Sequence, residues 1–122
     1  MSQSTTLILL PQTVYSSGAG NAVYTVTGNT QPAAAYYLGN KDLQTVNINL
    51  NSVTGNIVIE ASLATIPEDT DWFRVYELAA NNAANVNANS SVYTNINGNF
   101  VHIRAKVEDF ANGIVNFVKV SY

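Results

Sequence analysis

The chain has 122 residues, which is enough for one domain with one hydrophobic core. It contains no cysteine, which excludes disulfides and thiolate metal sites, and only 11% of its residues are charged, compared with about 25% in ordinary soluble domains. The net charge of −3 and the scattered basic residues predict no nucleic-acid partner. Seventeen asparagines and eleven threonines carry the polar surface instead. Such a surface desolvates at low cost, which favours permanent contact with other protein.

The first third of the chain predicts short strands between loose segments. Residues 1–6 are polar, so we expect a loose terminus. Residues 7–10 form an apolar run that is too short for a membrane span and has no basic segment before it, so we expect neither an export signal nor a membrane partner. A short strand is expected over residues 6–10. A second strand is expected over residues 21–27. Residues 33–39 fit either one helical turn or the entry to a strand, and an irregular segment or a strand is favoured.

The middle of the chain alternates between apolar and polar residues. Over residues 43–51 the apolar side chains stand at every second position and asparagines stand between them, which is typical of a half-buried strand. Residues 52–55 predict a turn, and residues 56–63 predict the returning strand. An acidic loop over residues 67–71 and a strand over residues 72–78 follow.

Residues 79–91 form a low-complexity segment of alanine, asparagine and serine. Alanine favours a helix, but the asparagines oppose it. We therefore expect a long loop or arm, a kind of segment that is often functional.

The last quarter of the chain carries two Asn-Gly pairs, at residues 97–98 and 112–113. Asn-Gly is the strongest short-range signal for a hairpin, because both central residues of a type I′ turn need a positive φ. The pattern predicts a β-meander of strands over residues 92–96, 99–107 and 114–121. Residues 1–122 are thus expected to form one all-β domain, an antiparallel β-sandwich of about eight strands and of jelly-roll type.

The residues that could carry catalysis or bind a metal are few. The single histidine, His102, lies in the middle of a predicted strand, so we interpret it as a surface or interface residue. Glu68, Asp69 and Asp71 share one loop, which could bind Ca²⁺ or be a solvated turn, and the turn is favoured. We expect no catalytic residue, no metal, no cofactor and no enzymatic activity.

Trp72 and Tyr76 are four residues apart, so strand alternation is expected to place them on one face of their strand. The simpler interpretation is that Trp72 fills the edge of the core. The alternative is a carbohydrate-stacking platform formed by Trp72 and Tyr76.

A resemblance extends over residues 43–122. It is carried by Gly55-Asn56-Ile57-Val58-Ile59-Glu60-Ala61-Ser62-Leu63, by Pro67 with Asp71-Trp72-Phe73, by Gly98-Asn99-Phe100-Val101-His102-Ile103-Arg104-Ala105, and by Phe110 with Gly113. These residues resemble the small β-sandwich virion proteins of tailed cyanobacterial bacteriophages, which are fibre-like or decoration proteins. The resemblance implies a structural protein made in the host cytoplasm and located in the virion, where it forms dimers or trimers and binds a capsid or tail component. It favours a head decoration (cement) protein, and the alternative is a carbohydrate-binding module of a fibre or tail appendage.

The contacts with such partners are expected from three segments, the apolar N-terminal run, residues 33–38 and the loop over residues 79–91. The candidate contact residues in these segments are Leu7, Ile8, Tyr36, Tyr37, Asn82 and Asn85.

Overall fold

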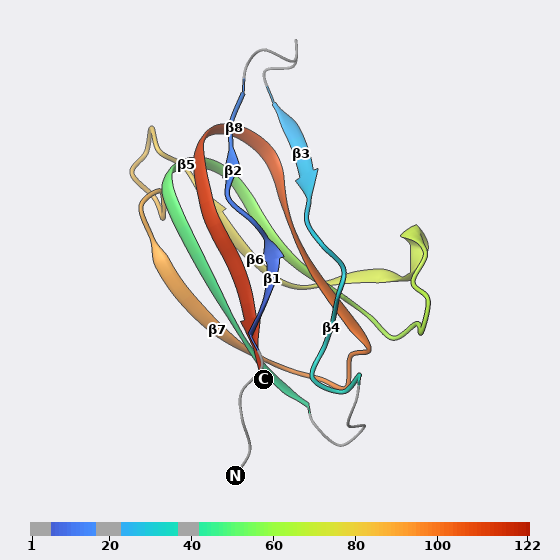
Figure 1. Ribbon diagram of the computed structural model, residues 1–122. Helices are drawn as coiled ribbons and strands as arrows, with labels where there is room; N and C mark the ends of the chain where they lie inside the picture. The colour runs from blue at the N-terminus through green and yellow to red at the C-terminus, as the bar shows by residue number, and fades with distance from the viewer. Residues whose placement is uncertain (1–5, 17–22, 37–41) are drawn as a thin grey trace.

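The computed structural model describes residues 6–16, 23–36 and 42–122 (Figure 1). Predictions that fall on residues 1–5, 17–22 and 37–41, including Tyr37, lie outside these residues. The described strands are β1 (Thr6–Leu10), β2 (Thr13–Val14), β3 (Tyr24–Thr27), β4 (Gln31–Pro32), β5 (Leu43–Ser62), β6 (Trp72–Ala80), β7 (Ser91–Asn97) and β8 (His102–Ser121), and a short 3₁₀ helix, η2 (Asp69–Asp71), precedes β6.

Two long strands, β5 and β8, form the centre of the sheet and pair with each other along almost their whole length. Each of them carries shorter strands on its outer edge. In the first half of the sheet, β1 and β2 pair with residues 114–121 of β8, and β7 pairs with residues 43–49 of β5. In the second half, β3 and β4 pair with residues 102–110 of β8, and β6 pairs with residues 55–62 of β5. All of these pairs are antiparallel.

The two halves meet at a corner where β5 and β8 bend together (Figure 1). The register of this pair shifts three times between Asn49 and Asn56, which is the mark of β-bulges. Positive φ angles occur at the same place, at Ser52 in β5 and at Asp109 and Gly113 in β8. Each bulge adds residues to one strand and sharpens its bend, so both strands turn without losing their partner.

One hydrophobic core lies inside this bend. In the first half of β5 the side chains of the core cluster stand at even positions, such as Val46 and Ile48, and in the second half at odd positions, such as Ile57 and Ile59. The bulges reverse the alternation, so the same face of the strand stays inside. Side chains from both halves therefore join one cluster, which includes Leu9, Leu10, Val46, Ile48, Ile57, Ile59, Ile103, Val107, Phe110, Val118 and Val120.

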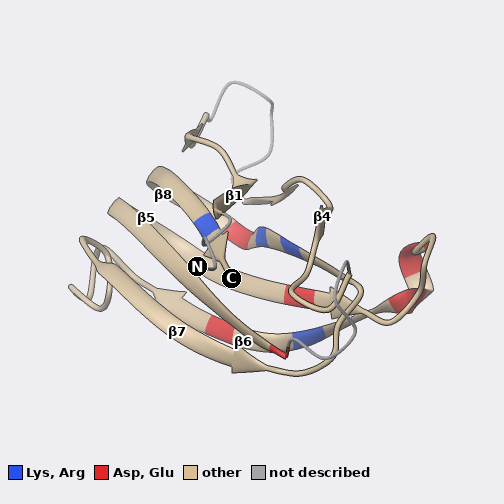
Figure 2. Cartoon of the chain, turned by 60° about the horizontal axis from the view of Figure 1, so that its bottom comes forward, with Lys and Arg blue, Asp and Glu red and all other residues tan. Residues whose placement is uncertain are grey.

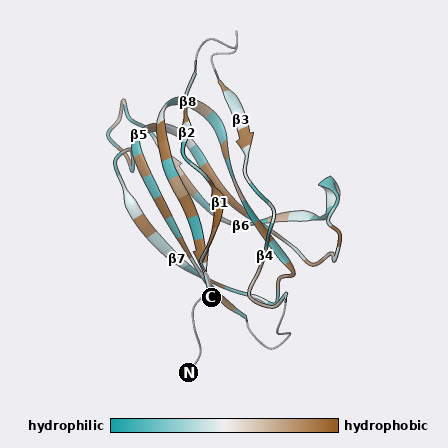
Figure 3. Ribbon diagram, viewed as in Figure 1, coloured by the Kyte–Doolittle hydropathy of each residue, from teal (hydrophilic) through white to brown (hydrophobic). Residues whose placement is uncertain are grey.

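The all-β class and the antiparallel pairing of eight strands are confirmed for the described residues. Two separate sheets, as in a sandwich, are not confirmed, because the strands of both halves belong to one hydrogen-bonded sheet. The hydropathy of the strands alternates along this sheet (Figure 3). No described helix is long and apolar enough to cross a membrane.

Three expectations about turns are wrong. Residues 52–55 and 112–113 lie within the continuous strands β5 and β8, so neither segment is a hairpin turn. The β-meander is also wrong, because β7 and β8 both pair with β5 and not with each other. Glycine and residues that tolerate positive φ serve bulges as well as turns, which explains why the sequence suggested hairpins here.

Hydrogen bonds hold the segment over residues 79–91, for which a long loop or arm is expected. β6 continues to Ala80, and backbone hydrogen bonds between Asn81 and Val86 then close a tight turn. Ala88 is 2% exposed, and its carbonyl accepts the N–H of Val53 at the corner of β5. Residues 81–90 lie outside both strands, and they supply hydrogen bonds that the bent strand needs.

Gly113 is the most restricted position of the corner. Its φ is +93°, and a Cβ at this position would meet the backbone of Ser52. We expect Gly113→Ala to lower the free energy of unfolding by about 2 kcal/mol or more, because it combines backbone strain with a clash against main-chain atoms. Asn112→Ala, at the exposed neighbouring residue, is the control and should change it by less than about 0.5 kcal/mol. Urea denaturation measures both, and equal stabilities of the two variants would contradict this account of the corner.

Candidate interaction surfaces

No pocket was found in the part of the chain that the structure describes. The functional candidates are therefore the two outer faces of the bent sheet, one on each half. Cross-strand partners share a face of a sheet, so the strand registers assign each side chain to its face.

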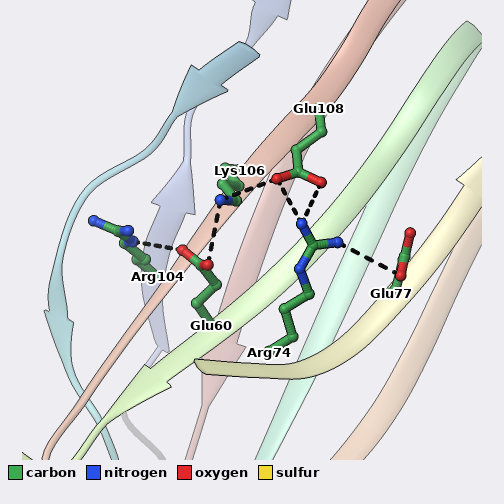
Figure 4. A network of polar contacts seen from close by, with 6 residues as sticks. All are labelled: Glu60, Arg74, Glu77, Arg104, Lys106 and Glu108. Carbon is green, nitrogen blue, oxygen red and sulfur yellow. Dashed lines mark hydrogen bonds and ion pairs between the residues drawn. The ribbon is translucent and has the colours of Figure 1, made fainter. Parts of the chain in front are cut away.

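The outer face of the second half, which we call the charged face, carries most of the ion pairs (Figure 4). At its centre, Glu60 on β5 lies directly opposite Arg104 on β8, and Lys106 is the next outward residue of β8. The Arg104 Nε donates to Glu60 Oε1 at 2.9 Å, and Lys106 Nζ lies 3.3 Å from Glu60 Oε2. Both carboxylate oxygens of Glu60 thus face a cation.

The chain of ion pairs continues through Glu108 to β6. Lys106 Nζ lies 3.0 Å from Glu108 Oε2, and Arg74 Nη2 donates to both oxygens of Glu108, at 2.7 and 2.8 Å. Arg74 Nη1 in turn lies 3.7 Å from Glu77 Oε2. Positive and negative groups alternate along this chain of ion pairs, in which three cations balance three carboxylates (Figure 4). The residues of both signs lie on β5, β6 and β8 (Figure 2).

Burial decides which of these pairs matter for stability. The side chain of Glu60 is 8% exposed, whereas those of Arg74 and Glu77 are almost half exposed. A buried carboxylate without a partner is strongly unfavourable, so Glu60 depends on its two cations. Burial by itself raises the pKa of the Glu108 carboxyl, but the hydrogen bonds and positive charges of Lys106 and Arg74 outweigh it and hold the pKa below its ordinary value.

Aromatic residues border the charged face. The guanidinium carbon of Arg104 lies 4.2 Å from the centre of the Trp72 ring, as in a cation–π contact. His102 places its Nδ1 3.1 Å from the carbonyl oxygen of Ala64, and its ring centre lies 5.2 Å from that of Tyr36. These contacts are consistent with His102 as a surface residue that is fixed in place.

The structure does not bring Trp72 and Tyr76 onto one face. Trp72 pairs with Ser62, but a register shift between Ile59 and Glu60 follows, and Tyr76 pairs with Ile59 of the core. Tyr76 therefore packs against the core while Trp72 lies beside Arg104 on the outer face. The expectation of a shared face is wrong, because the bulge changes the alternation of β6.

The outer face of the first half, which we call the amide face, is almost uncharged. One complete row across the four strands consists of Ile8, Lys119, Asn47 and Tyr93, and among the described residues Lys119 is the only charged side chain of the face. The rows on either side place further small or aromatic residues on this face, namely Thr6, Ser121, Thr45 and Asn95 in one row and Phe117, Asn49 and Ser91 in the other.

Hydrogen bonds between side chains hold the amide face in order. Thr45 Oγ1 donates to Asn95 Oδ1 at 2.7 Å, and Asn49 accepts from Asn116 at 2.8 Å. On the same face, Tyr93 is 73% exposed and Ile8 is 44% exposed. Exposed tyrosine among asparagine, serine and threonine is typical of protein surfaces that bind other molecules.

The predicted contact residues lie on different surfaces. Ile8 belongs to the amide face, whereas Leu7 packs against the core and Tyr36 contacts His102. Asn82 and Asn85 are exposed in the turn between β6 and β7. The sequence interpretation missed Tyr93 and Phe117. The regular alternation of residues 91–97 is the signal that could have placed Tyr93 on an outer face.

The acidic loop is organised by its own hydrogen bonds. The N–H of Glu68 donates to Asp71 Oδ2 at 2.7 Å, and the N–H of Asp71 donates to the carbonyl oxygen of Glu68 at 2.9 Å. Among the described residues, no group of three histidine, aspartate or glutamate side chains is placed to hold a metal ion.

Comparison with known proteins gave no matching protein family and no similar curated protein.

The ion pairs of Glu60 predict a position-specific loss of stability. We expect Glu60→Gln to lower the free energy of unfolding by about 3 kcal/mol, because it leaves Arg104 and Lys106 without their buried partner. Glu77→Gln is the matched control at the exposed end of the chain of ion pairs, and we expect it to cost less than about 0.5 kcal/mol. Chemical denaturation at neutral pH measures both. A Glu60→Gln variant as stable as Glu77→Gln would mean that the ion pairs contribute little.

The lowered pKa of Glu108 predicts how stability depends on pH. A carboxyl whose pKa is lower in the folded state contributes stability that is fully present above its ordinary pKa of 4.5 and is lost as the pH falls through the folded-state value. We therefore expect the difference in unfolding free energy between the unchanged protein and Glu108→Gln to shrink between pH 7 and pH 3. Urea titrations at a series of pH values test this, and a constant difference would contradict it.

Proposed function

We propose that the protein is a non-enzymatic structural protein of a bacteriophage virion, a head decoration protein that binds the capsid through its amide face. The observation that carries the proposal is the contrast between the two outer faces. The charged face satisfies its charges internally, whereas the amide face exposes Tyr93 and Ile8 among side chains of which Lys119 alone is charged in the described residues. Aromatic residues are enriched and charged residues depleted at the centre of protein interfaces, which is the composition of the amide face.

The order of the strands supports the same class of protein. If β5 and β8 are each divided at the corner, and β1 with β2 and β3 with β4 are each counted as one strand, the chain has eight strands. The first half of the sheet then has the order one, eight, three, six, and the second half has the order two, seven, four, five. We infer that this is the wrapped order of a jelly roll whose two sides remain joined. Viral capsid and lectin domains use jelly rolls, and this likeness supports the proposal by analogy of fold alone.

Carbohydrate binding is the second candidate, and Tyr93 is the observation that favours it. Its exposed ring lies in the row of Asn47, and Asn95 stands two residues further along β7 in the neighbouring row. A sugar could therefore stack on the ring and form hydrogen bonds with the amides. Trp72 is less suited to this role, because the Arg104 guanidinium lies over its ring.

The proposal predicts that binding depends on Tyr93. We expect the unchanged protein to co-sediment with capsids of a cyanobacterial tailed phage stripped of decoration protein. Tyr93→Ala should weaken this binding by about tenfold or more, because it removes the most exposed aromatic side chain of the amide face. Its stability should change little, since an exposed residue makes few core contacts.

Tyr36→Ala is the matched control, because it removes a partly exposed tyrosine outside the amide face. Equal losses in both variants, or no binding to any capsid, would overturn the proposal. If capsid binding is absent and a glycan array shows binding that Tyr93→Ala abolishes and Trp72→Ala does not, carbohydrate recognition at the amide face replaces it.

A further inference from the structure

The four outer edges of the sheet differ in how they are protected. The edge of β1 is covered, since Asn29 donates to the carbonyl of Leu9 and Gln31 donates to the carbonyl of Ile8, and Pro11 follows the strand. β3 and β4 are short and carry a bulge and Pro32. β6 carries a bulge and the charges of Arg74 and Glu77. Bulges, prolines, charges and covering segments are the ordinary means by which proteins block edge pairing.

β7 has none of these protections. Its seven residues pair with β5 without a register shift, and they include no proline and no charged residue. Within residues 6–16, 23–36 and 42–122, no strand pairs with its outer edge. In Figure 1 β7 is the outermost strand on its side of the sheet.

The backbone groups that β7 directs outward can be assigned from its ladder. Leu50 donates to the carbonyl of Ser90 at 2.8 Å, and Gly98 donates to the carbonyl of Asp42 at 2.7 Å. Hydrogen-bonded and non-hydrogen-bonded pairs alternate in an antiparallel ladder, so the even-numbered residues of β7 bond to β5. The carbonyls of Val92 and Ile96, which accept side-chain hydrogen bonds from Asn47 and Gln44 of β5, agree with this assignment.

The odd-numbered residues therefore present their N–H and C=O groups at the free edge. These residues are Ser91, Tyr93, Asn95 and Asn97. An antiparallel strand that presents the N–H and C=O groups of every second residue would form hydrogen bonds with all of these groups.

We propose that the outer edge of β7 pairs with β7 of a second copy of this chain. A two-fold axis places β7 of one copy antiparallel to β7 of the other. If the axis passes at Thr94, the central residue of β7, all seven residues of one strand lie opposite residues of the other. Ser91 then faces Asn97 of the partner and Tyr93 faces Asn95, so each outward backbone group meets its complement. The neutral edge brings no like charges together, which favours a second copy as the occupant.

The pairing would also extend the proposed binding surface. Tyr93 and Asn95 belong to the amide face, so the amide faces of two copies would become one continuous face across the axis. The inference does not depend on the identity of the capsid, because it concerns only the contact between copies of this chain.

Disulfide trapping tests the pairing directly, because the chain has no cysteine of its own. The axis makes Thr94 and its copy a non-hydrogen-bonded pair with Cα atoms about 4.5 Å apart, a separation that a disulfide can span. We expect Thr94→Cys to form a disulfide-linked dimer under mild oxidation in nearly all chains. Thr25→Cys, on the exposed side of β3, is the control and should form little.

A backbone variant tests the same edge without a cross-link. Asn95→Pro removes an outward N–H and should convert a dimer measured by light scattering into a monomer, whereas Asn95→Ala loses the same side chain, keeps the N–H and should remain dimeric. A monomer of the unchanged protein at about 100 μM, or a dimer that persists in Asn95→Pro, would overturn the proposal. If Asn95→Pro fails to fold, the cross-linking comparison decides alone. Failure to link Thr94→Cys would then overturn the pairing, whether or not capsid binding is observed.

Discussion

The fold depends on β5 and β8 remaining paired while both bend through the same corner. Each half of the sheet has one apolar face, and neither face could be buried without the other half. The bulges near Asn51 and the positive φ angles at Asp109 and Gly113 let the strands turn while their buried side chains stay on one side. The core cluster that closes inside the bend draws residues from both halves, so the corner and the core stabilise each other.

The same corner explains what could and could not be predicted from the sequence. The alternation of residues 43–51 and 92–96 located two strands correctly, because a half-buried strand leaves a period-two pattern whichever strand it pairs with. The Asn-Gly pair at residues 112–113 suggested a hairpin, yet β8 continues through Gly113, which lies against Ser52 where β5 is bulged. Local sequence specifies that a residue adopts positive φ. Whether the chain then reverses depends on β5, a partner more than fifty residues away, which local patterns do not reveal.

The surfaces were less predictable than the strands, because a face depends on register. Trp72 and Tyr76 are four residues apart, and the bulge in β6 places them on opposite faces. The bulge includes Val75, a residue type that does not indicate a bulge in the sequence. The row of Ile8, Lys119, Asn47 and Tyr93 combines four separate strands, and only the order of the strands brings it together. The charged face has the same origin, since Glu60, Arg74 and Glu108 belong to three different strands.

The two outer faces make opposite demands on a partner. Covering the charged face would remove water from Arg74 and Glu77 without offering better partners than they already have, and such desolvation is unfavourable. Covering the amide face removes water from hydroxyl and amide groups that already bond to one another, so less is lost and the area of Tyr93 and Ile8 is gained. The proposed pairing at the edge of β7 would be a separate, directional contact, because the backbone groups of this edge point along the plane of the sheet. The proposed partner on the amide face and the proposed second copy at the edge would therefore use different groups of the molecule, and neither would block the other.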